Sequence, residues 1–552
     1  MFLDVLSKKQ TFISQSNIFY NYTLGFETPS LDLLKTAGKL LKSGLTRCVC
    51  FSDFKYLYLD NNDQIKYDKI NLDGRNWDSS WKINFEKNLS SELFTELFLS
   101  CELLFHENRI VHENKIYIRA SLPPFVLEEN NDQITIYPGV KIYLDGVAIL
   151  YFQYDGEWSG LDEDQFLSLF INLNQRYFDK IWVDAKLQKL DGEVALKNSF
   201  DDVFSIGGNY FEGKKIKKLK EKMREDSRSL LKNSLEKKGR SFLFDEDSEW
   251  VLHQIAGTEE DDGNESWESS IETCRSIYSN AISCILVPKN SSDKDKSYDY
   301  IWQGRPSVSL LRFSKQPCEK SILLKNHHTT LIKLLNRANV DMGKYTLPED
   351  LRKFGDYCLH ANRSIYLWTW LRKEDEPENV WEHENAYSKV LENQARTEQV
   401  EYHNMVIARA CSWASNPPSS QHLFDAYTML AETENNIYHS SISGEISDAL
   451  KYIIEHFGTA GLIAPAKEMA RFRLDELKYR SDSVRNKSNY WLTFVFGLVG
   501  VTSFAEFVVN PLILDEWKGV SKVISPFLSF GASTVLILLI SGLIWYLSKK
   551  RD

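Results

Sequence analysis

Three polar residues lie near the end of an otherwise apolar stretch close to the C-terminus. Ser503, Glu506 and Asn510 follow one another at spacings of three and four residues, within residues 490–514. In an α-helix this spacing places the three side chains on one face. A carboxylate at membrane depth is costly unless it faces protein or water, so Glu506 indicates a functional position. Because carboxylate and amide oxygens attract cations, the pattern predicts a cation pathway.

Phe496 and Val499 extend the same stripe inward along the helix. If several copies of the chain surrounded one axis, the stripe would line a path along it. Glu506 would then form an acidic ring, and Asn510 a ring of amide oxygens at the outer mouth. The alternative is that Glu506 lies about one turn below the outer surface and extends to it. The sequence leaves both interpretations open.

Two segments near the C-terminus are long and apolar enough to cross about 30 Å of hydrocarbon. The first covers residues 490–514, and the second, residues 523–547, contains no charged residue. Basic residues precede the first segment and follow the second, where they are Lys549, Lys550 and Arg551. Basic flanks stay on the cytoplasmic side. We therefore expect a protein of the inner (cell) membrane that crosses it twice, with both termini in the cytoplasm.

The chain leading into the first apolar segment predicts an unusually long helix. Pro465 suits the first turn of a helix, and no further proline or turn cluster interrupts the chain before Asn510. One helix of about 45 residues would be about 68 Å long, enough to cross a bilayer and to project into the cytoplasm.

Upstream of these segments the sequence predicts a mixed α/β cytoplasmic domain, residues 1–320. Short strand signals alternate with helical spacing there, and strands dominate residues 115–154. Asp145 and Gly146, between two such strands, are typical of a two-residue hairpin turn. An antiparallel component is therefore expected in this domain.

Helical patterns dominate residues 321–487, which we expect to form a helical stalk domain. Its predicted helices include residues 348–373 and 379–411. Residues 488–552 would then hold the two transmembrane helices and the basic tail. The predicted fold class is α+β in the N-terminal domain and all-α from there to the C-terminus.

The composition argues against several classes of function. The net charge of the 552 residues is −11, so nucleic acid is not expected as a partner. Only Cys48 and Cys50 lie close together among the eight cysteines, so buried thiols are expected rather than a disulfide framework or a zinc site. The motifs of phosphate-binding loops, nucleophile elbows and zinc proteases are absent from the sequence, so an enzyme is not expected.

Two charged stretches carry alternative interpretations. Residues 214–222 are rich in lysine, which suits contact with anionic lipid or a phosphorylated ligand, or a solvated helix. Residues 259–265 are acidic but lack the ligand spacing of a calcium loop, so a surface loop is expected there.

The C-terminal third, about residues 380–552, resembles the CorA-type magnesium channel family. In that family a mixed α/β cytoplasmic domain leads into a very long stalk helix that lines the pore. A short outer loop, a second membrane helix and a basic tail follow. The matching pieces here are residues 465–510, 511–522, 523–547 and Lys549-Lys550-Arg551. Of the family's Gly-Met-Asn signature only Asn510 is present, because the chain reads Val508-Val509-Asn510.

The resemblance implies a homo-oligomer, a pentamer in that family, that conducts Mg²⁺ or another divalent cation under control of its cytoplasmic domain. Its partners would be the lipid bilayer, further copies of the chain and a small cytoplasmic ligand. Proteins with this membrane module and altered cytoplasmic domains include accessory effectors of antiviral systems. The alternative function is therefore a membrane-anchored signalling or defence effector, which permeabilises the membrane on binding a nucleotide-type ligand.

Overall fold

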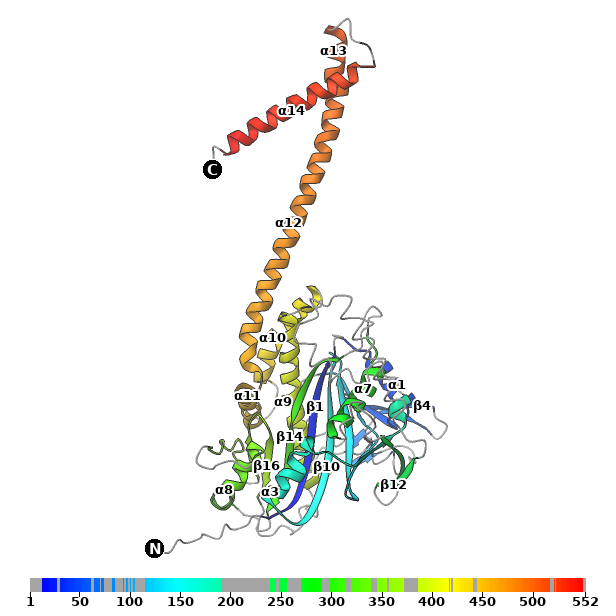
Figure 1. Cartoon of the computed structure of the whole chain (residues 1–552), viewed down its shortest axis with the longest axis vertical. Coiled ribbons are helices and arrows are strands. Elements are labelled where there is room, and N and C mark those ends of the chain that lie inside the picture. The colour runs from blue at the N-terminus through cyan, green and yellow to red at the C-terminus, as the bar shows by residue number, and fades with distance from the viewer. Residues whose placement is uncertain are drawn as a thin grey trace, which may run out of the picture. The chain divides into compact units, whose positions relative to one another are not determined.

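The computed structural model divides into two compact units, residues 1–470 and residues 471–552. Unit 1 is a mixed α/β unit with a large sheet, and unit 2 is helical (Figure 1). The structure describes residues 12–26, 30–60, 64–69, 71–73, 82–84, 93, 96, 97, 100, 103, 104, 115–189, 239–244, 248–255, 270–289, 298–313, 319–338, 345–354, 357–371, 386–415, 417, 420–439, 444–516, 521 and 523–549. The lysine-rich residues 214–222 and the acidic residues 259–265 lie outside this set.

Among the described residues, fourteen strands form one sheet whose main path is β12-β13-β11-β8-β9-β10-β1-β14-β16-β15, and β5 and β6 form a separate two-stranded sheet. Pairing along this path is antiparallel except between β14 and β16, which are parallel. The strands are β1 Phe12–Phe26, β2 Cys48–Phe51, β3 Lys55–Leu59, β4 Ile65–Lys69, β5 Asn71–Asp73, β6 Lys82–Asn84, β7 Tyr117–Ser121, β8 Phe125–Glu129, β9 Asp132–Tyr143, β10 Val147–Asp162, β11 Lys180–Asp184, β12 Arg240–Phe244, β13 Ser248–Ile255, β14 Tyr298–Phe313, β15 Tyr357–Ala361 and β16 Tyr366–Trp370.

The predicted hairpin between residues 115 and 154 is confirmed. β9 and β10 pair antiparallel on either side of Asp145-Gly146, and Gly146 has a φ of 82°, a left-handed conformation that glycine adopts without steric cost. Cys48 and Cys50 are buried free thiols on β2, as expected.

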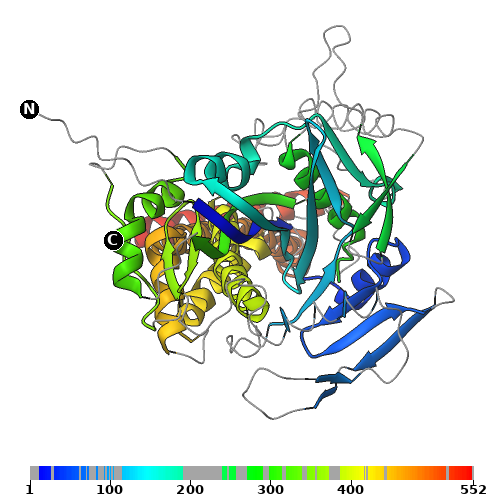
Figure 2. The ribbon, with the colours of Figure 1, turned by 90° about the horizontal axis from the view of Figure 1, so that it is seen from below.

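The described helices flank both faces of the sheet. In Figure 2, α3 and α9 lie on opposite sides of the dark blue β1. The helices and helical turns are α1 Leu33–Lys42, α3 Glu163–Phe166, η1 Leu167–Ile171, η2 Leu173–Gln175, α4 Lys186–Lys189, α7 Ile271–Ile285, α8 Lys320–Asn336, α9 Ala386–Ser415, α10 Ser420–His439, α11 Gly444–Phe457, η7 Ala460–Leu462, α12 Ile463–Phe504, η8 Ala505–Val509, α13 Asn510–Glu516 and α14 Ser525–Lys549.

The two faces of the sheet differ in chemistry because side chains alternate along each strand. On β1, Ile18, Tyr20 and Leu24 join an apolar core that also includes residues of α1, α7 and α8. The opposite side of β1 carries Asn17 and Asn21, both fully buried, and packs against α9. One face of the sheet is therefore apolar, whereas the face that α9 covers combines buried polar residues with smaller apolar clusters.

The prediction of a helix over residues 348–373 is wrong. β15 and β16 occupy this region and pair with each other, and β16 also pairs with β14 of the main sheet. The run Tyr366-Leu367-Trp368-Thr369-Trp370 is rich in strand-forming residues. The amide side chain of Asn362 accepts hydrogen bonds from the backbone N–H groups of Ser364 and Ile365, which closes the hairpin turn.

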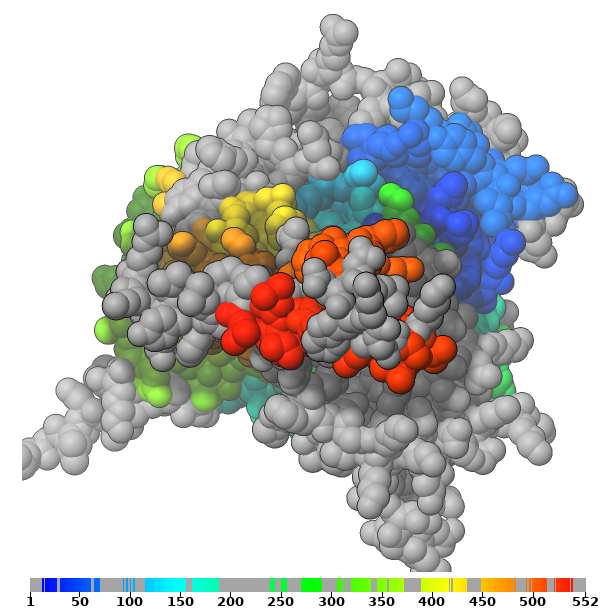
Figure 3. Space-filling view, turned by 90° about the horizontal axis from the view of Figure 1, so that it is seen from above, coloured from blue at the N-terminus to red at the C-terminus, as the bar shows by residue number. Residues whose placement is uncertain are grey.

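Unit 2 begins within α12, a continuous helix of 42 residues, and continues through the π-helical turn η8 to α13 and α14. Its described residues nearest the C-terminus are orange to red in Figure 3. No helix within the described residues combines the length and the apolar character needed to cross a membrane. Side chains of residues 541–549 in α14 lie outside the described set, as do Lys550 and Arg551.

Glu96, next to β2, gives unit 1 a titratable carboxyl whose effect on stability can be measured. The backbone N–H of Arg47 and the thiol of Cys48 donate to its Oε2 at 3.3 and 3.8 Å. Burial raises the pKa of Glu96 from 4.5 to about 7. Because the folded state then binds more protons than the unfolded state between these values, Glu96 makes stability fall as the pH rises through this window.

Replacing Glu96 by glutamine is expected to remove this loss, because glutamine stays neutral and keeps an oxygen acceptor. Relative to the wild type, the free energy of unfolding of the variant should rise by about 3 kcal/mol between pH 4.5 and pH 8. Denaturant unfolding of both proteins across this range measures the difference. Parallel pH profiles would contradict the assignment.

Candidate functional site

The five residues predicted to line a cation path lie along the end of α12 and the turn that follows it. Phe496 and Val499 are 70% and 56% exposed, and Ser503 and Glu506 are also exposed. Val501 and Ala505, about half a helical turn away from Ser503, are buried in the described part of unit 2. The other side chains described between residues 496 and 508 are exposed as well, so the stripe shares its exposure with most of the surface of this segment.

Asn510 departs from the expected stripe because η8 is a π-helical turn. Its extra residue rotates the following helix face by about 100° relative to an α-helix. Asn510 thereby joins the side of Val501 and Ala505, and its Oδ1 accepts a hydrogen bond from the hydroxyl of Ser525 on α14. The structure keeps Phe496, Val499, Ser503 and Glu506 on an exposed side and turns Asn510 toward its own second helix.

α14 meets η8 through small side chains. Ser525, Ser529 and Ser533 recur every four residues and are buried, and α14 packs against η8. Small residues at this spacing let two helices approach closely. Lys549, Lys550 and Arg551, predicted to lie at the membrane interface, fall outside the residues whose side chains the structure describes.

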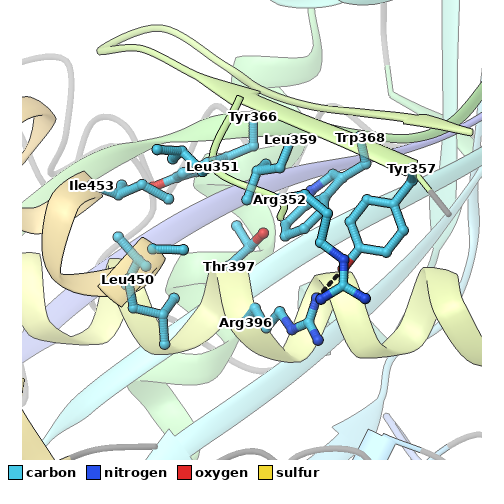
Figure 4. Close-up of a pocket in the computed structure, with 12 residues that line it drawn as sticks. Leu351, Arg352, Tyr357, Leu359, Tyr366, Trp368, Arg396, Thr397, Leu450 and Ile453 are labelled. Atoms are coloured by element: carbon cyan, nitrogen blue, oxygen red, sulfur yellow. Dashed lines mark hydrogen bonds between the residues drawn. The ribbon is translucent and has the colours of Figure 1, made fainter. Parts of the chain in front are cut away.

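A small pocket, with a cavity volume of about 20 Å³, lies in unit 1 between β15, β16, α9 and α11 (Figure 4). On one side Leu450 and Ile453 of α11 form an aliphatic wall, and on the other Tyr357 and Trp368 form an aromatic wall. The lining residues are Leu351, Arg352, Tyr357, Leu359, Tyr366, Trp368, Arg396, Thr397, Val400, Ala449, Leu450 and Ile453. The lining contains two arginines and no carboxylate.

Both arginines lie against the aromatic wall. The guanidinium of Arg352 is 4.6 Å from the ring centroid of Tyr357, and that of Arg396 is 5.8 Å from the ring of Trp368. Arg396 also donates from Nη1 to the hydroxyl of Tyr357. Burial raises the pKa of the Tyr357 hydroxyl, although the charges of Arg396 and Arg352 act in the opposite direction.

Arg396 is buried and paired with a carboxylate. Its Nη2 binds the carboxylate of Glu392, one turn away on α9, whose side chain is 28% exposed. Its side chain is 6% exposed, and its Nε has no hydrogen-bond partner among the described residues. A buried donor without a partner costs free energy.

Tyr366 connects the pocket to the C-terminal end of α11. Its hydroxyl donates to Glu401 at 2.7 Å and accepts from Nη1 of Arg305, also at 2.7 Å. Nη2 of Arg305 donates to the backbone carbonyl of Phe457, the last residue of α11. Burial opposes the charge of Arg305, but Tyr366 and Glu401 keep its pKa above the ordinary value.

The chain that follows α11 is fixed to α9. The amide of Asn404 accepts a hydrogen bond from the backbone N–H of Thr459 at 3.0 Å. Gly458 packs so closely that a Cβ there would overlap Asn404 and lie 2.7 Å from the carbonyl oxygen of Ile454. α12 begins at Ile463, directly after this joint, so α9 and α11 set the position from which α12 starts.

Beneath α9 lies a buried ion cluster. Glu398 accepts hydrogen bonds from both terminal nitrogens of Arg119, and Nζ of Lys141 is 3.6 Å from its Oε2; all three side chains are fully buried. Burial alone would raise the pKa of Glu398, but the two cations lower it below the ordinary value. The cluster attaches α9 to β7 and β9.

Sequence reasoning missed both the pocket and the ion cluster. One sequence feature indicated a polar environment for residues 379–411, which were predicted to form a helix. Polar and charged residues occur around the whole circumference of this helix, so it has no continuous apolar stripe. A long helix of this kind is either solvated or held by a polar interior. In α9 residues 393–407 are all buried, and polar contacts such as that of Glu398 with Arg119 lie beside apolar contacts of Tyr402, Met405 and Val406.

Within the described part of the chain no group of three or more histidine, cysteine, aspartate or glutamate side chains is arranged to hold a metal ion. Comparison with known protein families, characterised proteins and solved structures finds no match to this chain.

Proposed function

We propose that this chain is one subunit of a homo-oligomeric, CorA-like membrane channel for metal cations, gated by unit 1. The observation that carries the proposal is the path of α12. This helix starts at the joint of α9 and α11 and continues without interruption to the turn that holds Glu506. In the proposed mechanism a change in unit 1 acts on the carboxylate through this helix.

The membrane part of the proposal rests on the sequence. Residues 523–547, most of α14, contain no charged side chain, and Lys549, Lys550 and Arg551 follow. Two spans with cytoplasmic termini in the inner (cell) membrane fit this pattern. The hydrogen bond between Ser525 and Asn510 supports a hairpin of the two helices, because such bonds join helices within a bilayer.

In this arrangement the exposed stripe of Phe496, Val499, Ser503 and Glu506 faces the other copies of the chain around a central axis. Glu506 supplies the negative charge that attracts Mg²⁺ or another divalent cation and replaces part of its hydration shell. Asn510 acts differently from the predicted ring of amide oxygens, since its Oδ1 is engaged by Ser525. It holds the turn on which Glu506 is presented.

Replacing Glu506 by glutamine is expected to reduce divalent cation flux, because the shape of the side chain is kept and its charge is removed. Proteoliposomes containing the full chain and a fluorescent indicator for Mg²⁺ measure the influx, which we expect to fall roughly tenfold or more. Asp482→Asn, on the same helix upstream of the apolar segment, is the matched control and should leave the flux unchanged. Equal flux through wild type and Glu506→Gln would remove Glu506 from the pathway.

The pocket favours one further reading, a signalling or defence effector whose pore opens only when a cytoplasmic ligand binds. The observation that favours it is that the pocket lies against α11, the helix that precedes α12. The same proteoliposomes separate the two functions. Flux in the absence of any added small molecule supports a transporter, whereas flux that appears only after adding a small-molecule extract of the host cell supports the effector.

A further inference from the structure

We propose that Ser525, the first residue of α14, is a positioning residue for Glu506. Its hydroxyl holds Asn510 in a helical conformation, and Asn510 in turn stabilises the π-helical turn η8 that carries the carboxylate. Only the consequence for cation flux rests on the proposed function. The support of the turn by Ser525 follows from the geometry of unit 2.

Pro511, directly after Asn510, makes a regular helix unfavourable at this point of the chain. It has no backbone N–H, and in a regular α-helix its ring would clash with the carbonyl group of Phe507, four residues earlier. The chain can respond by ending the helix or by widening one turn. The structure shows the second response, because η8 is a π-helical turn and α13 continues to Glu516.

The conformation of Asn510 decides between these two responses. A residue that precedes proline is biased toward an extended backbone. Asn510 nevertheless has a φ of −63° and a ψ of −43°, which is an α-helical conformation. Its Oδ1 accepts the hydrogen bond from the hydroxyl of Ser525, which connects the half-buried Asn510 to α14. This hydrogen bond offsets the unfavourable backbone conformation, so its loss favours an end of the helix at Asn510.

Ser525 is itself held in place by its surroundings. Its side chain is fully buried, and its backbone N–H donates to the carbonyl group of Ser521 at 3.1 Å. Pro526 follows at the start of α14, a position where proline is favourable in a helix. In addition, α14 packs against both η8 and α13. The hydroxyl therefore reaches Asn510 from a fixed position.

The position of Glu506 depends on η8 because Glu506 belongs to this turn, one turn before Asn510. If the helix ended at Asn510, the last carbonyl groups of η8 would lose their helical partners and the exposed carboxylate would no longer be fixed. In the proposed channel, carboxylates at fixed distances favour a divalent over a monovalent cation, because the attraction grows with the charge of the ion. Ser525 should therefore affect the preference for divalent cations.

Hydrogen exchange of the full chain in lipid nanodiscs tests the proposal without any ion flux. Ser525→Ala removes only the hydroxyl, and we expect the amides of residues 505–516 to exchange roughly five- to tenfold faster, as the loss of one hydrogen bond implies. Asn510→Ala removes the same hydrogen bond from the other side and should have a similar effect. The double variant should exchange little faster than either single one, because both changes break one contact.

Ser529→Ala is the matched control. Ser529 lies one turn further along α14 and is 1% exposed, but its hydroxyl donates to the carbonyl group of Pro526 in the same helix at 3.0 Å. Its loss should leave the exchange of residues 505–516 unchanged. In proteoliposomes we expect the ratio of Mg²⁺ influx to K⁺ influx to fall roughly fivefold or more in Ser525→Ala and to stay constant in Ser529→Ala.

The proposal is overturned if residues 505–516 exchange no faster in Ser525→Ala than in Ser529→Ala, or if the effects of Ser525→Ala and Asn510→Ala simply add. An unchanged ratio of Mg²⁺ to K⁺ influx in Ser525→Ala, when the wild type conducts, would overturn it as well. If the wild type conducts no cation, the channel proposal fails, and hydrogen exchange alone decides whether Ser525 holds the turn.

Discussion

Replacing Glu398 by glutamine is expected to lower the free energy of unfolding by about 3–5 kcal/mol. The substitution keeps the volume of the side chain but removes the negative charge that faces Arg119 and Lys141. Both cations have fully buried side chains, so water cannot take over the role of Glu398. Denaturant unfolding followed by tryptophan fluorescence measures the loss.

The matched control is Glu455→Gln on α11. Glu455 pairs with Lys451 at 4.0 Å, and the two side chains are 38% and 37% exposed. Exposed pairs of this kind contribute at most about 1 kcal/mol. If the two glutamine variants lost similar stability, the cluster beneath α9 would not be the anchor that the geometry indicates.

Replacing Arg305 by methionine is expected to destabilise the chain by about 3–5 kcal/mol as well, because a buried cation that serves two acceptors is lost. Arg305 is 3% exposed, and it binds the hydroxyl of Tyr366 and the carbonyl of Phe457. Its loss also frees the C-terminal end of α11. We therefore expect hydrogen exchange to increase in α11 more than in α8, which lies on the opposite face of the sheet.

Arg240→Met provides the comparison. Arg240 is 52% exposed and lies 3.5 Å from Glu128, so the loss should be below about 1 kcal/mol. An Arg305→Met protein with wild-type stability and unchanged exchange in α11 would show that Arg305 does not connect the pocket to the end of this helix.

Several helices, strands and turns could be predicted from local sequence patterns. The turn at Asp145-Gly146, the strands around it and helices such as α10 follow from local propensity and spacing, and the structure has them. The strands β15 and β16 were missed because their aromatic residues at 366–370 also fit a helical pattern. Pairing with β14, more than 50 residues earlier, decides the outcome there.

The stripe containing Glu506 shows a second reason why a sequence pattern can misplace a side chain. Spacings of three and four residues imply one face only if the helix is regular. The π-helical turn at residues 505–509 adds one residue to a turn and directs Asn510 toward Ser525. No single residue in the run Ala505-Glu506-Phe507-Val508-Val509 predicts a π-helical turn.

The pocket and the ion cluster were beyond sequence reasoning because their members come from distant segments. Arg119 and Glu398 are 279 residues apart, and Arg305 and Phe457 are 152 apart. Spacing arguments reach only a few turns along the chain, whereas these contacts depend on the fold of the whole sheet. The lack of an apolar stripe in α9 was the one local indication of a polar interior.

The central claim is that several copies of the chain surround an axis and direct Glu506 toward it. Electron cryomicroscopy of the full chain in lipid nanodiscs tests this directly. We expect a rotationally symmetric assembly in which Glu506 of every copy faces the central path. A single copy per nanodisc, or an assembly in which Glu506 faces the acyl chains, would contradict it.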